Sequence, residues 1–158
     1  MKKNKKTTKE KKETKEETGE KKEKKKTRIV ATGKRKTAIA RAVIREGKGI
    51  IKINSRPLSS FSFLKRLAIE EPLRIASEIG ISPSFDIEVN VRGGGQESQI
   101  EASRLAIARA LLAFTRSLEL KKAFLQYDRF LLVADVRRKE AYKPCDSKAR
   151  AARQKSYR

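Results

Sequence analysis

Histidine is absent from this 158-residue chain, and cysteine occurs once, at Cys145. Without histidine, the Ser-His-Asp and Cys-His catalytic arrangements are excluded, and so are zinc sites built on histidine or several cysteines. A single cysteine excludes an internal disulfide and fits a reducing compartment. No apolar run reaches the roughly 18 residues of a membrane span, and the N-terminus lacks the apolar stretch of a secretory signal. We therefore expect a soluble, intracellular protein.

Positive charge dominates the composition. Lysine and arginine number 41 against 19 acidic residues, which gives a formal net charge of +22 and a sequence pI near 10.4. Such an excess is typical of proteins that bind a polyanion, either nucleic acid or an acidic membrane surface. The length suffices for one compact domain with one core.

The charge also divides the chain into three parts. Residues 1–26 hold 13 lysines and 6 glutamates and almost nothing apolar, which predicts a disordered extension or an arm that folds on RNA. Residues 27–136 carry the apolar periodicity and form the predicted globular domain. Residues 137–158 hold nine basic residues and two acidic ones. Because they cannot bury apolar area to offset the entropy of ordering, we predict an extended basic tail that becomes ordered on a polyanion.

Hydrophobic spacing predicts an α+β domain with its helices on one face of the sheet. Residues 37–45 alternate, and residues 50–54 follow a turn with two glycines, which predicts an antiparallel hairpin. Residues 63–79 are predicted to form two short helices joined near Glu71, because Pro72 suits a first helical turn. Residues 85–92 alternate as a half-buried strand. A long helix over 96–118, a short helix over 121–127 and an apolar strand over 130–133 complete the domain.

Two glycine-containing segments are candidate phosphate sites. Arg92-Gly93-Gly94-Gly95-Gln96 lies between a strand and a helix, so it either holds a phosphate or is a tight connection that needs positive φ; both remain open. Residues 33–37 do not form a Walker loop, since Arg28 stands where glycine is needed and Arg35 where serine or threonine is needed. A basic turn leading into a strand, with three successive cations for RNA phosphates, is the better interpretation.

Other charged side chains carry less information. Among the helix arginines, Arg104, Arg109 and Arg116 either line a polyanion or are solvated. The carboxylates near strands have no partner that would make an acid/base pair or a metal site; they are Asp86, Glu88, Asp128 and Asp135. The sequence therefore argues against an enzyme, and we expect no metal and no cofactor.

Three blocks of residues, in order along the chain, resemble the universal small-subunit ribosomal protein nine family. The first block is Gly33-x-Arg35-Lys36-x-Ala38-x-Ala40 with Gly47-x-Gly49 and Ile53-Asn54-x-x-Pro57. The second is Gly93-Gly94-Gly95 with Gln99, Ala102 and Ala106-Ile107-Ala108-Arg109-Ala110-Leu111. The third is Asp135-x-Arg137-x-x-Glu140, Lys148-Ala149-Arg150 and the ending Gln154-Lys155-Ser156-Tyr157-Arg158, which resembles the archaeal and eukaryotic branch.

The resemblance implies a fold like the second domain of ribosomal protein five, with a left-handed βαβ crossover. It also implies a structural role in the small ribosomal subunit, in the cytoplasm. There the domain would bind ribosomal RNA and neighbouring proteins of the subunit head, and the tail would reach the anticodon stem-loop of peptidyl-site transfer RNA. No membrane partner is implied.

Carried onto this chain, the resemblance gives two sets of site residues. The expected ribosomal RNA contacts are Lys34, Arg35, Lys36, Arg92, Gly93, Gly94, Arg104, Arg109, Arg137, Arg138, Lys148, Arg150 and Arg153. The expected contacts of the tail tip with transfer RNA are Lys155, Ser156, Tyr157 and Arg158. The chain departs from the family pattern between Glu140 and Asp146, at the start of the tail.

Two other functions stay open from the residues alone. A free nucleic-acid-binding protein would use the same charge in exchangeable, salt-dependent binding. A phosphotransferase on a related fold would use the loop at Gly93 and would bind nucleotide.

Overall fold

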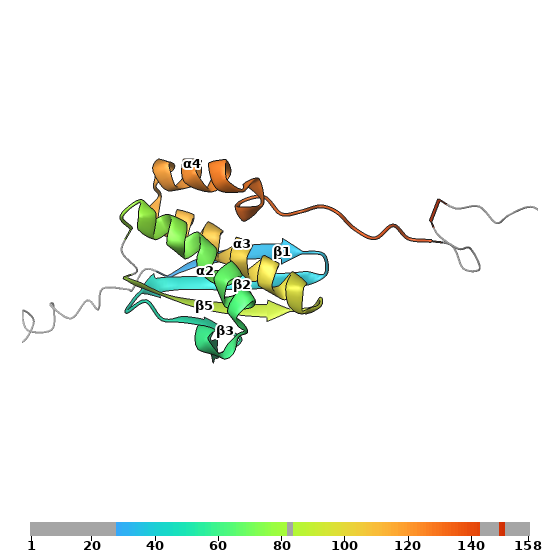
Figure 1. The fold of residues 1–158 in the computed structure, drawn as a ribbon, viewed down its shortest axis with the longest axis horizontal. Coiled ribbons are helices and arrows are strands. Elements are labelled where there is room, and N and C mark those ends of the chain that lie inside the picture. The colour runs from blue at the N-terminus through green and yellow to red at the C-terminus, as the bar shows by residue number, and fades with distance from the viewer. Residues whose placement is uncertain (1–27, 82–83, 143–148, 151–158) are drawn as a thin grey trace, which may run out of the picture.

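A five-stranded sheet underlies the fold of the computed structural model, which describes residues 28–81, 84–142 and 149–150 (Figure 1). The strands are β1 (Ile29–Arg35), β2 (Ala38–Glu46), β3 (Ile51–Ile53), β4 (Arg56–Pro57) and β5 (Phe85–Arg92). The helices are α2 (Phe63–Glu78), α3 (Gln96–Thr115) and α4 (Leu118–Tyr127), with short 3-10 helices η1 (Leu58–Ser60) and η2 (Arg129–Leu131). The predicted extension over 1–26 and most of the predicted tail over 137–158 lie outside the described residues, so that division of the chain stays a prediction.

The sheet is mixed, with the strand order β1-β2-β5-β3-β4. Strand β5 pairs antiparallel with β2 and parallel with β3. The predicted hairpin between residues 37–45 and 50–54 is therefore wrong, because β5 lies between the two segments. The register explains the insertion: Ile87 of β5 stands between Ile44 and Ile51, so the central strand buries apolar side chains against both neighbours. As a result, β3, α2 and β5 form a parallel crossover unit.

Strand β1 was not predicted from the sequence, and neither was the two-residue strand β4. Residues 33–37 were expected to be a turn, but the turn is confined to Lys36 and Thr37, and β1 continues through Arg35. Gly33 is buried under α3, where a Cβ atom would lie 2.2 Å from the carbonyl oxygen of Ala102. The glycine therefore serves a close approach of helix and strand, and not a change of chain direction.

Two further elements differ from the prediction. A single helix, α2, runs through Pro72, so the predicted pair of helices is wrong. Pro72 is fully buried with the apolar face of the helix, and this packing outweighs the backbone hydrogen bond that proline removes. The predicted strand over 130–133 is also wrong. The Asp128 carboxylate accepts a hydrogen bond from the backbone N–H of Phe130 at 2.8 Å and begins η2 instead.

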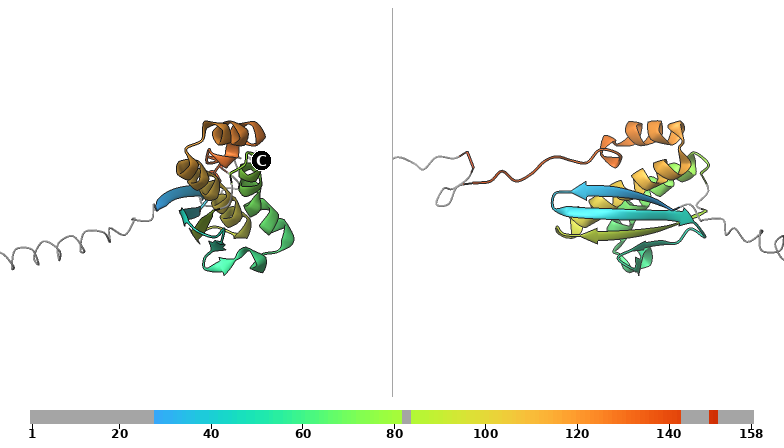
Figure 2. Two further views of the ribbon diagram at one scale, coloured as in Figure 1. Left: turned by 90° about the vertical axis from the view of Figure 1, so that its left-hand side faces the viewer. Right: turned by 180° about the vertical axis from the view of Figure 1, so that it is seen from behind.

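The helices lie on one face of the sheet, as predicted, and the other face is open (Figures 1 and 2). The alternation of β2 and β5 is confirmed: Ala38, Ala40, Ala42 and Ile44 face the helices, as do Phe85, Ile87, Val89 and Val91. Helix α3 ends earlier than predicted, with Arg116 in the left-handed region at φ 53°. The chain thus forms one α+β domain. Within the described residues, every helix is too short or too polar to cross a membrane.

Candidate nucleic-acid interface

Exposed cations gather at one end of the sheet, where β1 turns into β2 and β5 passes into α3. The strand register places Lys34 and Arg92 on either side of Ile39, all three on the open face. The C-terminal segment leaves the domain at the same end (Figures 1 and 2). We call this surface the basic end and define it by its exposed cations, which are Lys34, Lys36 and Arg92. The cations Arg137, Arg138 and Lys139 are exposed on the segment that leaves the domain there.

The triple glycine joins β5 to α3 at the basic end. Gly93 and Gly94 have φ values of 75° and 70°, and Cβ atoms there would lie 2.6 Å from the Thr37 carbonyl oxygen and 2.9 Å from the Ala38 Cβ. These two positions thus need glycine for the tight connection that the sequence left open. Gly95 differs, because it is the N-cap of α3 and a Cβ atom there would meet nothing within 4 Å. Phosphate binding by this loop stays a prediction.

Three of the predicted RNA-binding arginines hold the domain together. The Arg35 guanidinium pairs with Glu101 and Asp135, and its side chain is 18% exposed. It faces inward because Ala31, Gly33 and Arg35 alternate on the helix side of β1. The small residues at 31 and 33 are the sequence signal that could have revealed this orientation, had β1 been recognised as a strand.

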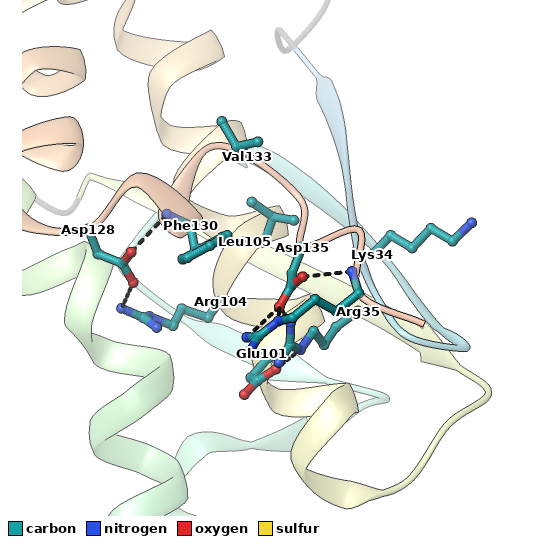
Figure 3. Close-up of a pocket in the computed structure, with 10 residues that line it drawn as sticks. Lys34, Arg35, Glu101, Arg104, Leu105, Asp128, Phe130, Val133 and Asp135 are labelled. Atoms are coloured by element: carbon teal, nitrogen blue, oxygen red, sulfur yellow. Dashed lines mark hydrogen bonds and ion pairs between the residues drawn. The ribbon is translucent and has the colours of Figure 1, made fainter. Parts of the chain in front are cut away.

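The other two arginines lie on α3. Arg104 pairs with Glu71 of α2. It also pairs with Asp128, at 3.1 Å, as Figure 3 shows. Arg109 donates hydrogen bonds to two backbone carbonyls, Leu132 at 2.9 Å and Thr32 at 2.7 Å. Their guanidinium groups are therefore engaged within the protein, and the expected contacts of Arg35, Arg104 and Arg109 with RNA stay predictions.

The open face at the opposite end of the sheet has its charges balanced. Arg45 lies 3.9 Å from Glu88, and Lys52 stands beside Glu88 in the register of β3 and β5. Asp86 accepts hydrogen bonds from the backbone N–H groups of Ile50 and Lys48, each at 2.9 Å. These bonds, that from Ile50 foremost, lower the pKa of Asp86 below 3.8 although partial burial opposes the shift. The unbalanced positive charge on this face is therefore at the basic end and at Arg41, which stands between Thr32 and Asn90 in the register of β1, β2 and β5.

The expected site residues of the tail fall mostly outside the described part. Lys148, Arg153, Lys155, Ser156, Tyr157 and Arg158 are among the residues that the structure does not describe. Arg150 is described, is exposed, and pairs with Glu140 at 2.9 Å. Lys139 lies over the ring of Tyr142, 4.9 Å from its centroid, and Tyr142 belongs to the stretch that departs from the family pattern.

Three of the four candidate carboxylates serve the fold. Asp86 shapes a turn, Asp128 begins η2, and Asp135 is buried between arginines. Among the residues that the structure describes, no three histidine, cysteine, aspartate or glutamate side chains are grouped to hold a metal ion. The fold and its surface define a class: a small α+β domain with exposed cations at one end of its sheet, from which a basic C-terminal segment departs.

Comparison with known proteins gives the family. Residues 33–158 match the model of ribosomal protein S9/S16. The small ribosomal subunit protein uS9 of Methanococcus vannielii is 49% identical over 130 residues, which cover 80% of this chain and 95% of the relative. The uS9 proteins of Thermoplasma volcanium and Methanococcus maripaludis are each 47% identical, over 82% and 80% of this chain and over 98% and 95% of their own lengths. The chain belongs to the ribosomal protein S9/S16 family.

The relationship confirms two expectations. These relatives are archaeal, in agreement with the branch to which the C-terminal residues pointed. Their class is structural and not catalytic, in agreement with the expectation that the chain is no enzyme.

Proposed function

We propose that this protein is a structural constituent of the small ribosomal subunit in the cytoplasm, where it binds ribosomal RNA and neighbouring proteins of the subunit head. The observation that carries the proposal is the match over residues 33–158 together with relatives named as small-subunit proteins. The fold assigned by the resemblance, with a left-handed crossover through β3, α2 and β5, belongs to the same proposal. The free nucleic-acid-binding protein and the phosphotransferase become the alternatives to be tested.

The basic end is the proposed contact with ribosomal RNA. Its cations are exposed, while two acidic side chains that line a cavity with Lys34 are already paired: Glu101 and Asp135 both contact Arg35. Phosphate groups are therefore the natural counterions for Lys34, Lys36 and Arg92, and such contacts position a protein without reading sequence. Arg35, Arg104 and Arg109 contribute by holding β1, α3 and the C-terminal segment in place.

The tail is the proposed contact with peptidyl-site transfer RNA. Residues 151–158 carry three cations and no aliphatic side chain larger than alanine, so their binding energy must come from phosphate, sugar and stacking contacts. Lys148, Arg150 and Arg153 would lie against ribosomal RNA, and Lys155, Ser156, Tyr157 and Arg158 against the anticodon stem-loop. Contacts of this kind accept every transfer RNA, because they do not depend on base identity.

Truncation tests the proposal. Subunits assembled with the chain lacking residues 153–158 should contain it at one copy each and should release peptidyl-site transfer RNA faster than wild-type subunits. Deletion of residues 1–20 is the control, since that segment has neither arginine nor apolar anchors, and it should change neither incorporation nor release. An unchanged release rate from the truncated subunits would remove the tail contact from the proposal.

Sedimentation in a sucrose gradient at high salt separates the alternatives. Comigration with small subunits at about one copy each supports the structural role. Recovery in light fractions, or salt-dependent release from mixed nucleic acid, would favour a free nucleic-acid-binding protein. Micromolar nucleotide binding by the purified chain would favour the phosphotransferase.

A further inference from the structure

Asp135 is the last buried side chain along the described chain. It is 8% exposed, whereas residues 136–142 and 149–150 are all exposed. Residue 135 is therefore the point at which the C-terminal segment leaves the domain, and Figure 1 shows the segment running away from the sheet beyond it. What holds this point decides the position and direction from which the tail starts.

The Asp135 carboxylate has charged partners on both sides. One oxygen accepts from the backbone N–H of Arg137 at 2.8 Å, and the other accepts from the Arg137 Nε at 2.8 Å. The same second oxygen pairs with Arg35, which reaches it from β1 and also contacts Glu101 of α3 (Figure 3). A buried carboxylate is thus bonded to the sheet on one side and to the chain two residues further on, which fixes the backbone direction at the exit.

A second clamp lies just before the exit. Arg109 of α3 binds the Leu132 carbonyl and the Thr32 carbonyl of β1. The segment 132–135 therefore lies against β1 through two arginines, without a strand ladder among the described residues. Because side-chain contacts replace a ladder here, single substitutions can release the exit while the sheet stays paired.

We propose that Asp135 is a positioning residue for the tail: the contacts of Asp135 with Arg35 and Arg137 fix the place and direction in which residues 136–158 leave the domain, so that the tip meets transfer RNA at a reduced cost in ordering. The inference rests on the proposed function and deepens it. A tail that starts from a fixed point and direction loses less conformational freedom on binding than one that starts from a loose segment. The contact with transfer RNA then depends on a carboxylate that never touches RNA.

The test is a mutant cycle on assembled small subunits with peptidyl-site transfer RNA. Asp135→Asn keeps the size of the side chain but removes its charge, and should raise the dissociation rate of transfer RNA about three- to tenfold, the cost of ordering a few released residues. The same substitution in the chain lacking residues 153–158 should add nothing, because no tip is left to position. Asp128→Asn is the matched control. Asp128 and Asp135 line the same cavity, of about 170 Å³, but Asp128 precedes the exit along the chain. Removal of its charge should therefore leave the dissociation rate unchanged.

Arg137→Lys guards against failure of Asp135→Asn to fold or assemble. Lysine keeps the positive charge for a phosphate but loses the Nε–H bond, and the Arg35–Asp135 pair remains, so the rate should rise in the full-length chain alone. If tip truncation speeds release but Asp135→Asn leaves the rate unchanged, the inference is overturned. Where Asp135→Asn does not assemble, an unchanged rate for Arg137→Lys has the same consequence. Equal rises with and without the tip also overturn it, since they indicate a general structural defect. If tip truncation itself changes nothing, the proposed function fails, and the positioning role fails with it.

Discussion

Gly33→Ala tests the closest approach between the sheet and α3. A Cβ atom at residue 33 would lie 2.2 Å from the Ala102 carbonyl oxygen, 2.7 Å from the Ala106 backbone nitrogen and 3.1 Å from the Ala106 Cβ. The obstructing atoms are mostly helix backbone, which cannot rotate away, so α3 must shift from β1 by about 1 Å to restore van der Waals separation. Overpacking of this kind costs about 3 kcal/mol, at the upper end of its usual range.

A smaller contribution to the free energy of unfolding opposes the cost of the clash. Alanine restricts the unfolded chain more than glycine does, which stabilises the folded state by about 0.5–1 kcal/mol where the backbone is compatible. Gly33 is compatible, because its φ is not positive. The net loss should be about 2 kcal/mol, and with a urea m-value of about 1.5 kcal/mol/M the midpoint should fall by more than about 1 M.

Urea denaturation of the full-length chain, followed by far-ultraviolet circular dichroism, measures this shift. Gly95→Ala is the matched control, since a Cβ atom there meets nothing within 4 Å and the φ of −93° suits any residue. Its midpoint should stay within about 0.4 M of wild type, because the small loss at the N-cap and the gain in the unfolded state offset each other. A Gly33→Ala midpoint as close to wild type as that of the control would refute the close-approach argument.

Three other predictions concern single side chains. Arg116→Gly should stabilise the chain by about 0.5–1 kcal/mol, because Arg116 holds φ 53° at the C-terminus of α3, and a lower thermal midpoint would contradict this. The hydrogen bond to Glu71 raises the pKa of Tyr127 above 10.0, so the stability from this bond is present below pH 10 and is lost as the pH rises through the raised pKa. In an absorbance titration, the phenol transition at the highest pH should be present in wild type and absent from Tyr127→Phe. The lowered pKa of Asp86 acts in the opposite direction: its stabilising effect is present above pH 3.8 and is lost as the pH falls through the lowered pKa. The difference in urea midpoint between wild type and Asp86→Ala should therefore shrink below pH 3.8, and a difference that stays constant would exclude the carboxylate as its cause.

Local patterns predicted those elements whose burial is set by their own sequence. Strand β5 alternates strictly over Phe85–Arg92, and α3 carries apolar residues at helical spacing, so one buried face sufficed to identify each. The pairing of β3 with β5 was beyond such reasoning, because these strands are joined through α2 and meet only in the folded sheet. A short turn rich in glycine favours a local hairpin between β2 and β3, but β3 pairs with the distant β5 instead.

The errors at β1 and α2 share a physical cause. In each case a residue with a strong local preference is used for packing. Gly33 in β1 makes room for α3, and Pro72 in α2 is buried on the apolar face of the helix. Tertiary contact outweighs local propensity at such positions, and a single sequence does not show where this happens. The prediction of the site was affected for the same reason. Because β1 was not recognised as a strand, the inward orientation of Arg35 was not predicted.

Under the proposed function, Arg35 would affect binding to RNA although its side chain is mostly buried and already paired. By pairing with Glu101 and Asp135 it neutralises two carboxylates that would otherwise compete with phosphate for the cations of the basic end. Arg35→Gln should therefore weaken the binding of the full-length chain to single-stranded RNA severalfold at low salt, beyond the loss of one phosphate contact. Adding Glu101→Gln should recover part of the affinity, because it removes one of the released charges. If the double variant binds no better than Arg35→Gln, the affinity is lost with the arginine itself, and Arg35 is a direct contact after all.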